Sequence, residues 1–182
     1  MRKLIKVILL VLLLTICMPC MAKVLRSDDG WIHITTSDYW NLSSHGDDPA
    51  NVRLLSIELN KDTRIIITRG KDKENYRTLR ECNFAPAMPE TVAYLRCYQL
   101  SDRGFNNARV VTWNFFGNGY NLVVHANKDG KRHILYETEI VYNYYRYTFQ
   151  VFANEYNEYE AARVFSTMTI DGIPFSRWVH SF

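Results

Sequence analysis

The side chains best suited to catalysis form a small set of histidines, hydroxyls and acids. Residues 43–48 read Ser-Ser-His-Gly-Asp-Asp and hold the three group types that acyl transfer uses. Catalytic triads are assembled from separate elements, so neighbours in one loop do not by themselves predict mutual hydrogen bonds. We interpret the segment as a polar turn and assign no catalytic residue. Hydrolysis by His45 or His125, with Asp47 or Glu137, is the enzymatic alternative.

Two histidines are candidate metal ligands. The Asn-Lys-Asp-Gly sequence at 127–130 predicts a three-residue hairpin loop with its glycine left-handed, which would pair His125 with His133. The same register places Glu137 and Glu139 on the face of the histidines, opposite the apolar side chains. Two opposed neutral imidazoles with a carboxylate nearby would suit zinc or copper. The alternative is a solvated cross-strand pair that needs no ligand, and we therefore assign no cofactor.

The amino terminus has the pattern of an export signal. Three basic residues and no acid precede the apolar segment: Arg2, Lys3 and Lys6. The apolar run at 7–16 is about half the roughly 20 residues that span a bilayer. We therefore expect a signal peptide over 1–22, cut after Ala22, and one domain over 23–182. The mature chain should be periplasmic or secreted, without a stable membrane anchor.

Removal of this leader leaves two of the four cysteines, Cys82 and Cys97. An even number of cysteines in an oxidising compartment predicts a disulfide, which would stabilise the fold by roughly 3 kcal/mol. The two thiols lie too far apart in sequence for the Cys-x-x-Cys pattern of a redox pair. A zinc site would need two further ligands, and no histidine has finger spacing from either cysteine.

Composition indicates one globular domain and a neutral folded part. The chain has 182 residues, 47% hydrophobic and 23% charged, which excludes a disordered chain. The formal charge of +3 includes the three bases of the leader, which leaves 22 − 3 = 19 basic against 19 acidic residues beyond it. A neutral body lacks the basic excess that displaces phosphate counterions, so we expect no nucleic-acid partner. Another protein is the expected partner.

Aromatic residues mark a candidate partner surface. The tyrosine-rich segment near 142–152 is too dense for every ring to point inward with a period of two, so some rings must face outward. An exposed row of Tyr142, Tyr144 and Phe152 would suit a protein or glycan partner. The alternative is decoration of a sheet edge. Trp178, in the tail, either docks on the body or engages a partner.

The elements that position these residues follow from periodicity and turn signals. Strands are expected at 31–36, 52–59, 64–69, 108–116, 120–126, 131–141 and 144–153, and an edge strand at 169–173. Helices are expected at 71–82 and 155–167, and residues 37–51 should form a loop. Residues 91–100 are ambiguous, with composition favouring a strand. This order predicts an α+β fold, an antiparallel meander covered by helices in an α/β/α-sandwich-like arrangement.

The end of the chain resembles the closing strand, helix and hydrophobic tail of PsbP-like proteins, which include the bacterial envelope protein DcrB. The resemblance covers residues 144–152, 154–168 and 169–170. The early strand that begins at Trp31 and the loop with Trp40 are also similar in order to the opening of that family. The resemblance implies an α/β/α sandwich and a non-catalytic role in the cell envelope.

These observations lead to one functional hypothesis and two alternatives. The first is an exported, non-catalytic binding protein of the bacterial cell envelope that serves envelope maintenance or assembly. The alternatives are an immunity protein that neutralises a secreted toxin and a hydrolase of unknown substrate. An enzyme should place a histidine beside a carboxylate in a concave site, whereas a protein binder should expose an aromatic patch.

Overall fold

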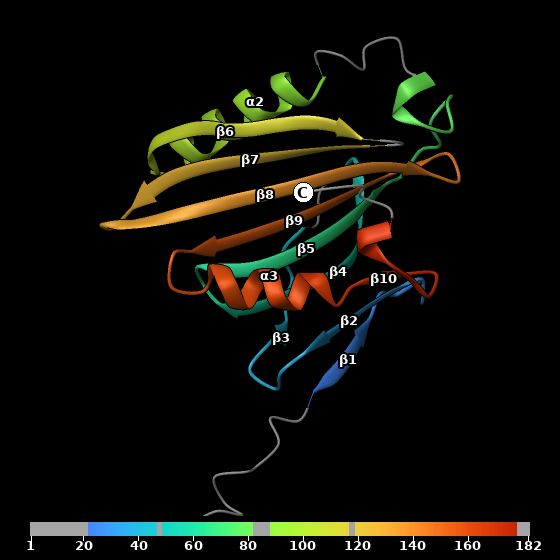
Figure 1. Ribbon diagram of the computed structural model, residues 1–182, viewed down its shortest axis with the longest axis horizontal. Coiled ribbons are helices and arrows are strands. Elements are labelled where there is room, and N and C mark those ends of the chain that lie inside the picture. The colour runs from blue at the N-terminus through green and yellow to red at the C-terminus, as the bar shows by residue number, and fades with distance from the viewer. Residues whose placement is uncertain (1–21, 47–48, 82–87, 117–118, 178–182) are drawn as a thin grey trace, which may run out of the picture.

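The computed structural model describes residues 22–46, 49–81, 88–116 and 119–177. Within these residues the chain forms a seven-stranded and a four-stranded sheet, both antiparallel, and two α-helices (Figure 1). This confirms the predicted α+β class, with an antiparallel sheet covered by helices. No helix among the described residues has both the length and the apolar character needed to cross a bilayer.

The large sheet joins a hairpin to a four-stranded meander. Its strands run in the order β3-β4-β5-β9-β8-β7-β6. Their bounds are β3 (Asn41–Leu42), β4 (Asn51–Asn60), β5 (Thr63–Gly70), β6 (Asn106–Phe116), β7 (Gly119–Lys128), β8 (Lys131–Tyr142) and β9 (Tyr145–Asn154). The hairpin β4-β5 and the meander β6 to β9 both confirm the sequence prediction. Pairing of β5 with β9 then brings residues distant in the chain onto one surface.

The small sheet and the second helix close one side of the molecule. The sheet contains β1 (Lys23–Arg26), β2 (Ile32–Thr36), β10 (Thr169–Ile170) and β11 (Ile173–Pro174), and the 3-10 turn η3 (Phe175–Arg177) follows it. The helix α3 (Glu158–Ser166) buries Ala161, Val164 and Phe165 at helical spacing. The predicted late helix and edge strand are therefore present, the edge strand as two short pieces.

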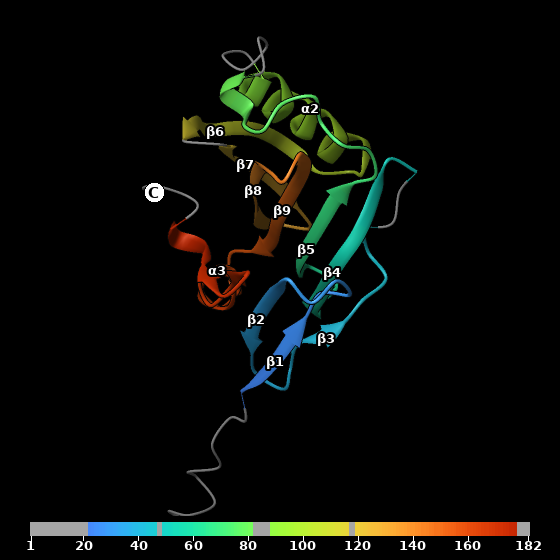
Figure 2. The same cartoon turned by 90° about the vertical axis from the view of Figure 1, so that its right-hand side faces the viewer.

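The two helices cover different halves of the large sheet on opposite faces. The helix α2 (Met88–Asp102) contacts β6 and β7, whereas α3 contacts β9 and β5 (Figure 2). Each helix packs on its own apolar cluster of sheet residues. Over β5 and β9, none of the described helices therefore lies above the face of the sheet that α2 occupies. This uncovered part of the sheet forms the floor of the site described below.

The strand favoured for residues 91–100 is wrong, because α2 occupies them. The buried Ala93 and Leu100 and the half-buried Arg96 and Cys97 recur at helical spacing toward the sheet. The large residues Tyr94, Leu95 and Tyr98 are exposed, so the apolar stripe that marks an amphipathic helix is missing from the sequence. At its end, Gly104 takes a φ of 80° and the amide of Phe105 donates to the carbonyl of Leu100, a Schellman ending.

The helix predicted at 71–82 is also wrong over the described residues, which form bends and the 3-10 turn η1 (Leu79–Glu81). Side-chain bonds to β9 replace the helical ladder here. Arg146 donates to the carboxylate of Glu74 at 2.9 Å and to the hydroxyl of Tyr76 at 2.6 Å. The predicted loop at 37–51 contains the short strand β3, and β1 was not predicted.

Candidate functional site

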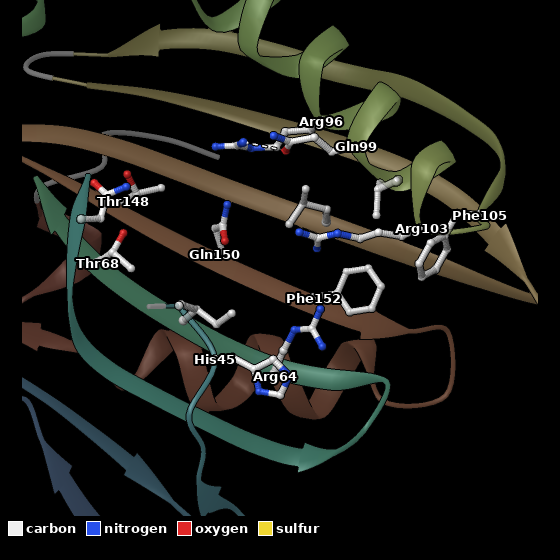
Figure 3. Close-up of a pocket in the computed structure, with 15 residues that line it drawn as sticks. His45, Arg64, Thr68, Arg96, Gln99, Arg103, Phe105, Thr148, Gln150 and Phe152 are labelled. Atoms are coloured by element: carbon white, nitrogen blue, oxygen red, sulfur yellow. Dashed lines mark hydrogen bonds between the residues drawn. The ribbon is translucent and has the colours of Figure 1, made fainter. Parts of the chain in front are cut away.

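A cavity of about 400 Å³ lies between the C-terminal half of α2 and the uncovered strands β5 and β9. We call it the α2 groove. Apolar side chains such as Ile66, Leu135 and Phe152 line it together with six polar ones: Arg64, Thr68, Arg96, Gln99, Thr148 and Gln150. Its floor follows from the period of two, because Arg64 pairs with Phe152 and Thr68 with Thr148 across β5 and β9. Figure 3 shows these side chains around one common space.

A buried ion pair fixes one wall of the groove. The Nε atom of Arg96 on α2 donates to the Oε2 atom of Glu137 on β8 at 2.7 Å, and its Nη2 atom donates to Oε1 at 3.1 Å. Glu137 is fully buried and also accepts a hydrogen bond of 2.6 Å from the Nε2 atom of Gln150. Gln99 accepts another bond from Arg96 at 2.8 Å. The bidentate pair therefore clamps α2 to the sheet beside the cavity.

A second buried carboxylate, Glu139, lies two residues along β8 on the same face. Burial raises the pKa of Glu139 to about 7, against the opposing effect of Arg146, whose Nη1 atom lies 3.2 Å from Oε1. The nearby charge of Glu137 raises the pKa further. Glu139 is therefore a titratable group near neutral pH, behind the wall of the groove and not in its lining.

Glu139 should make stability depend on pH. Its folded-state pKa lies above the ordinary value of 4.5, so the folded state binds the proton more tightly than the unfolded state. Stability from this group is present below about pH 4.5 and is lost as the pH rises through about 7. We expect the wild type to lose on the order of 2 kcal/mol relative to Glu139→Gln between pH 5 and pH 8, measured by urea unfolding. Parallel pH profiles of the two proteins would contradict this assignment.

The predicted pairing of His125 with His133 is wrong by one residue. The turn is a two-residue one, with Asp129 and Gly130 at φ of 53° and 73°, and it pairs His125 with Ile134. A slip of one residue moves every side chain to the other face, so the two imidazoles lie on opposite sides of the sheet. The same slip places Glu137 and Glu139 on the side of α2, with His133.

Each histidine has its own surroundings. His133 stacks on the ring of Phe152 with centroids 5.4 Å apart, and burial lowers its pKa. The Nε2 atom of His125 lies 3.5 Å from the guanidinium of Arg132, and burial followed by this charge lowers the pKa of His125. The geometry for joint metal binding is therefore lost. Elsewhere in the described parts of the chain, no three His, Cys, Asp or Glu residues gather as a metal site would require.

His45 lies at the rim of the α2 groove without triad geometry. Its Nδ1 atom lies 3.2 Å from the hydroxyl of Ser43 and 3.6 Å from the carboxylate of Glu58. A triad needs one ring nitrogen for the nucleophile and the other for the acid, so these contacts do not activate Ser43. Asp47 lies outside the described residues. His125 and Glu137 face opposite sides of the sheet, and they do not meet.

The predicted aromatic row breaks up in the structure. Phe152 is buried and lines the α2 groove, where the guanidinium of Arg64 lies 5.0 Å from its ring centroid. Tyr142 is half-buried and meets the ring of Trp31 edge-on. Tyr144 is 37% exposed and accepts a hydrogen bond from Arg77 at 2.7 Å. Of these three rings, Tyr144 is the one that keeps the predicted exposure. Trp178 lies outside the described residues, so its role stays a prediction.

The predicted disulfide stays a prediction. Cys97 is half-buried on α2, and burial raises the pKa of its thiol. Its expected partner, Cys82, lies outside the described residues, as do residues 1–21 of the predicted signal peptide.

Sequence reasoning missed the arginines of the groove. Arg64, Arg96 and Arg103 come from the start of β5, the middle of α2 and the loop behind it. The overall neutrality of the chain concealed this local cluster, and the strand prediction for 91–100 removed Arg96 from any common face. One signal was present in the sequence. Arg64 and Thr68 lie four residues apart in the predicted strand, and the period of two places both on the same face.

Comparisons with known proteins give a fold. No family model matches the chain, and no curated protein matches its sequence. The solution structure of cyanobacterial PsbP (CyanoP) from Synechocystis has a TM-score of 0.56 at 10% identity, covering 83% of this chain and 93% of that one. The PsbP-like resemblance predicted from the end of the chain is therefore confirmed at the level of the fold.

Two further structures are similar at lower scores. A protein from Bacteroides thetaiotaomicron has a TM-score of 0.41 at 11% identity, covering 81% of this chain and 48% of that one. LpqN, described as involved in cell envelope biogenesis of Mycobacterium tuberculosis, has a TM-score of 0.39 at 14% identity, covering 82% of this chain and 90% of that one.

Proposed function

We propose that this protein is exported to the bacterial cell envelope and binds a small polar ligand in the α2 groove without transforming it. The observation that carries the proposal is the uncovered polar floor formed by β5 and β9 beside the clamped wall of α2. Ligand sites are concave, largely preformed and equipped with a few convergent polar groups. Thr68, Thr148 and Gln150 supply such groups on strands, where the backbone pairing holds them in place.

The partners of the titratable groups support binding over hydrolysis. The carboxylate of Glu137 accepts hydrogen bonds from Arg96 and Gln150. We therefore assign this carboxylate a structural role and not a catalytic one. The same ring nitrogen of His45, Nδ1, faces both the hydroxyl of Ser43 and the carboxylate of Glu58, so the ring does not link a nucleophile to an acid. Envelope maintenance or assembly is the role we infer for such a binder, on the strength of its export pattern and the role that the family resemblance implies.

Export gives a direct prediction. The protein recovered from the periplasm should begin at Lys23, because the apolar run and the small residues before the cut match a signal peptide. Its intact mass should also show no free thiol after alkylation under denaturing conditions, as a disulfide between Cys82 and Cys97 requires. A mass that retains residues 1–22, or two alkylated cysteines, would contradict the corresponding half of this prediction.

The binding proposal is tested by filling the groove. Thr68→Trp places a large ring on its floor, and Thr112→Trp places the same ring on the exposed surface of β6 as a matched control. A small-molecule fraction from the cell envelope should raise the melting temperature of the wild type and of Thr112→Trp, but not of Thr68→Trp. The bound compound should be recovered unchanged in mass. Conversion of the compound, or equal stabilisation of all three proteins, would contradict the proposal.

A further inference from the structure

A second cavity of about 450 Å³ adjoins the α2 groove and shares part of its lining, and two arginines line both. Arg64 comes from β5 and Arg103 from the loop that follows α2. In Figure 3 their guanidinium groups point into the same space beside the ring of Phe152. The cation–π contact between Arg64 and Phe152 holds one guanidinium over a fixed surface. Two guanidinium groups therefore converge where the cavities meet.

The charge around this junction is one-sided. The second cavity is lined by five cations, Lys61, Arg64, Arg103, Lys128 and Lys131, and by two acids, Asp62 and Asp129. Among the residues that line the first cavity there is no Asp or Glu. The excess in the second cavity is 5 − 2 = 3 positive charges. A cavity lined mostly by one sign of charge concentrates ions of the opposite sign.

Neither guanidinium at the junction forms an ion pair with a carboxylate of the described chain. Burial lowers the pKa of Arg64, and the like charge of Arg103 lowers it further, against the weaker effects of Glu58 and Asp62. The two arginines thus repel one another, and an anion between them would relieve the repulsion.

We propose that the junction of the two cavities binds the phosphate group of a soluble phosphorylated ligand, with Arg64 and Arg103 as its bidentate donors. The proposal rests on the proposed function and names the class of ligand for the same site. Guanidinium groups match the oxygens of phosphate in pairs, and the excess of three cations suits a dianion better than a carboxylate. The polar floor at Thr68 and Gln150 would then meet hydroxyl groups of the same ligand.

Lys128 supports the junction from the hairpin between β7 and β8. Its ammonium group donates to the carbonyl of Arg103 at 2.9 Å and lies 4.8 Å from the ring centroid of Phe105. These contacts tie the loop that carries Arg103 to the sheet. Because an ammonium group has three donors, Lys128 retains capacity to bond an oxyanion at the same place.

The lining of the groove favours a soluble ligand over a lipid. Thr68, Thr148 and Gln150 put polar groups among the apolar side chains of its floor, so a long acyl chain entering there would desolvate them without forming new hydrogen bonds. We therefore commit to a soluble ligand, and vesicles are the arm of the test that would show a phospholipid instead.

The test titrates the full mature chain with glucose 6-phosphate, glucose and glucuronate by calorimetry at low salt. Glucose 6-phosphate should bind the wild type more tightly than either comparator, and added NaCl should weaken the binding. Arg64→Gln and Arg103→Gln should each raise its Kd roughly tenfold or more, the effect of losing a charge-assisted bidentate contact. Arg26→Gln, an exposed arginine on β1, is the matched control and should leave the Kd unchanged.

Four outcomes would overturn the inference: no binding of glucose 6-phosphate, equal Kd values in all variants, tighter binding of glucuronate, or binding only to vesicles that contain phosphatidylglycerol. Exposed Arg103 can be replaced without disturbing the interior, so the test stands even if Arg64→Gln fails to fold. If the envelope fraction stabilises the wild type but not Thr68→Trp while glucose 6-phosphate does not bind, the phosphate inference fails and the proposed function survives.

Discussion

Replacing Arg96 by methionine should cost about 3–5 kcal/mol of unfolding free energy, the range for breaking a buried ion pair from one side. Glu137 is fully buried, and after the change only the amide of Gln150 would remain bonded to its charge. The clamp between α2 and β8 would be lost at the same time. Urea unfolding followed by circular dichroism measures the change, and ligand binding in the α2 groove should fall with it.

Two further variants separate the cost of the unpaired charge from other effects. Arg96→Met combined with Glu137→Leu should recover most of the lost stability, because no buried charge remains. Arg163→Met breaks the exposed pair with Glu160, where Nε lies 2.7 Å from Oε2, and should cost no more than about 1 kcal/mol. A cost for Arg96→Met as small as that for Arg163→Met would contradict the role of the buried pair.

Gly119→Ala should destabilise the protein by about 3 kcal/mol or more, at the upper end of the cost of overpacking. A Cβ atom at this position would overlap the backbone carbonyl oxygen of Glu139 and would also lie 2.8 Å from side-chain atoms of Ile140 and Phe116. The carbonyl belongs to the paired strand β8, so relief requires a shift of the ladder between β7 and β8. Thermal unfolding measures the loss.

Gly130→Ala is the matched control for this substitution. A Cβ atom there meets nothing within 4 Å, but the φ of 73° is left-handed and costs an L-residue roughly 1–2 kcal/mol. The loss for Gly119→Ala should therefore exceed the loss for Gly130→Ala. The reverse order would show that the strands adjust to the extra methyl group, and that the close approach at Gly119 is not a constraint on the sheet.

Local signals were sufficient to predict every strand of the large sheet except the two-residue β3. Turn residues separate the runs of the meander, and their positions gave β6 to β9 in the correct order. The register was harder, because the Asp-Gly turn between β7 and β8 fits either a two-residue or a three-residue loop. That choice decided whether His125 faces His133, and no pattern in the neighbouring strands corrected it.

The helices were predicted less well, for a physical reason. The side chains of α2 that face the sheet include the small Ala93 and the polar Arg96. The large side chains of Tyr94, Leu95 and Tyr98 are exposed to solvent. The burial of Arg96 depends on Glu137, which is 41 residues away in sequence. A window of ten or twenty residues cannot contain this information. The same holds for the α2 groove, whose arginines come from separate elements.

The proposed function and the phosphate site both require a ligand that binds between α2 and the strands β5 and β9. The most direct measurement is an NMR titration of the mature protein with glucose 6-phosphate, following backbone amide shifts. We expect the shifts to concentrate on β5, on β9 and at the end of α2, around Arg64, Gln150 and Arg103. Shifts confined to the face of the sheet covered by α3, or no shifts at all, would contradict the account.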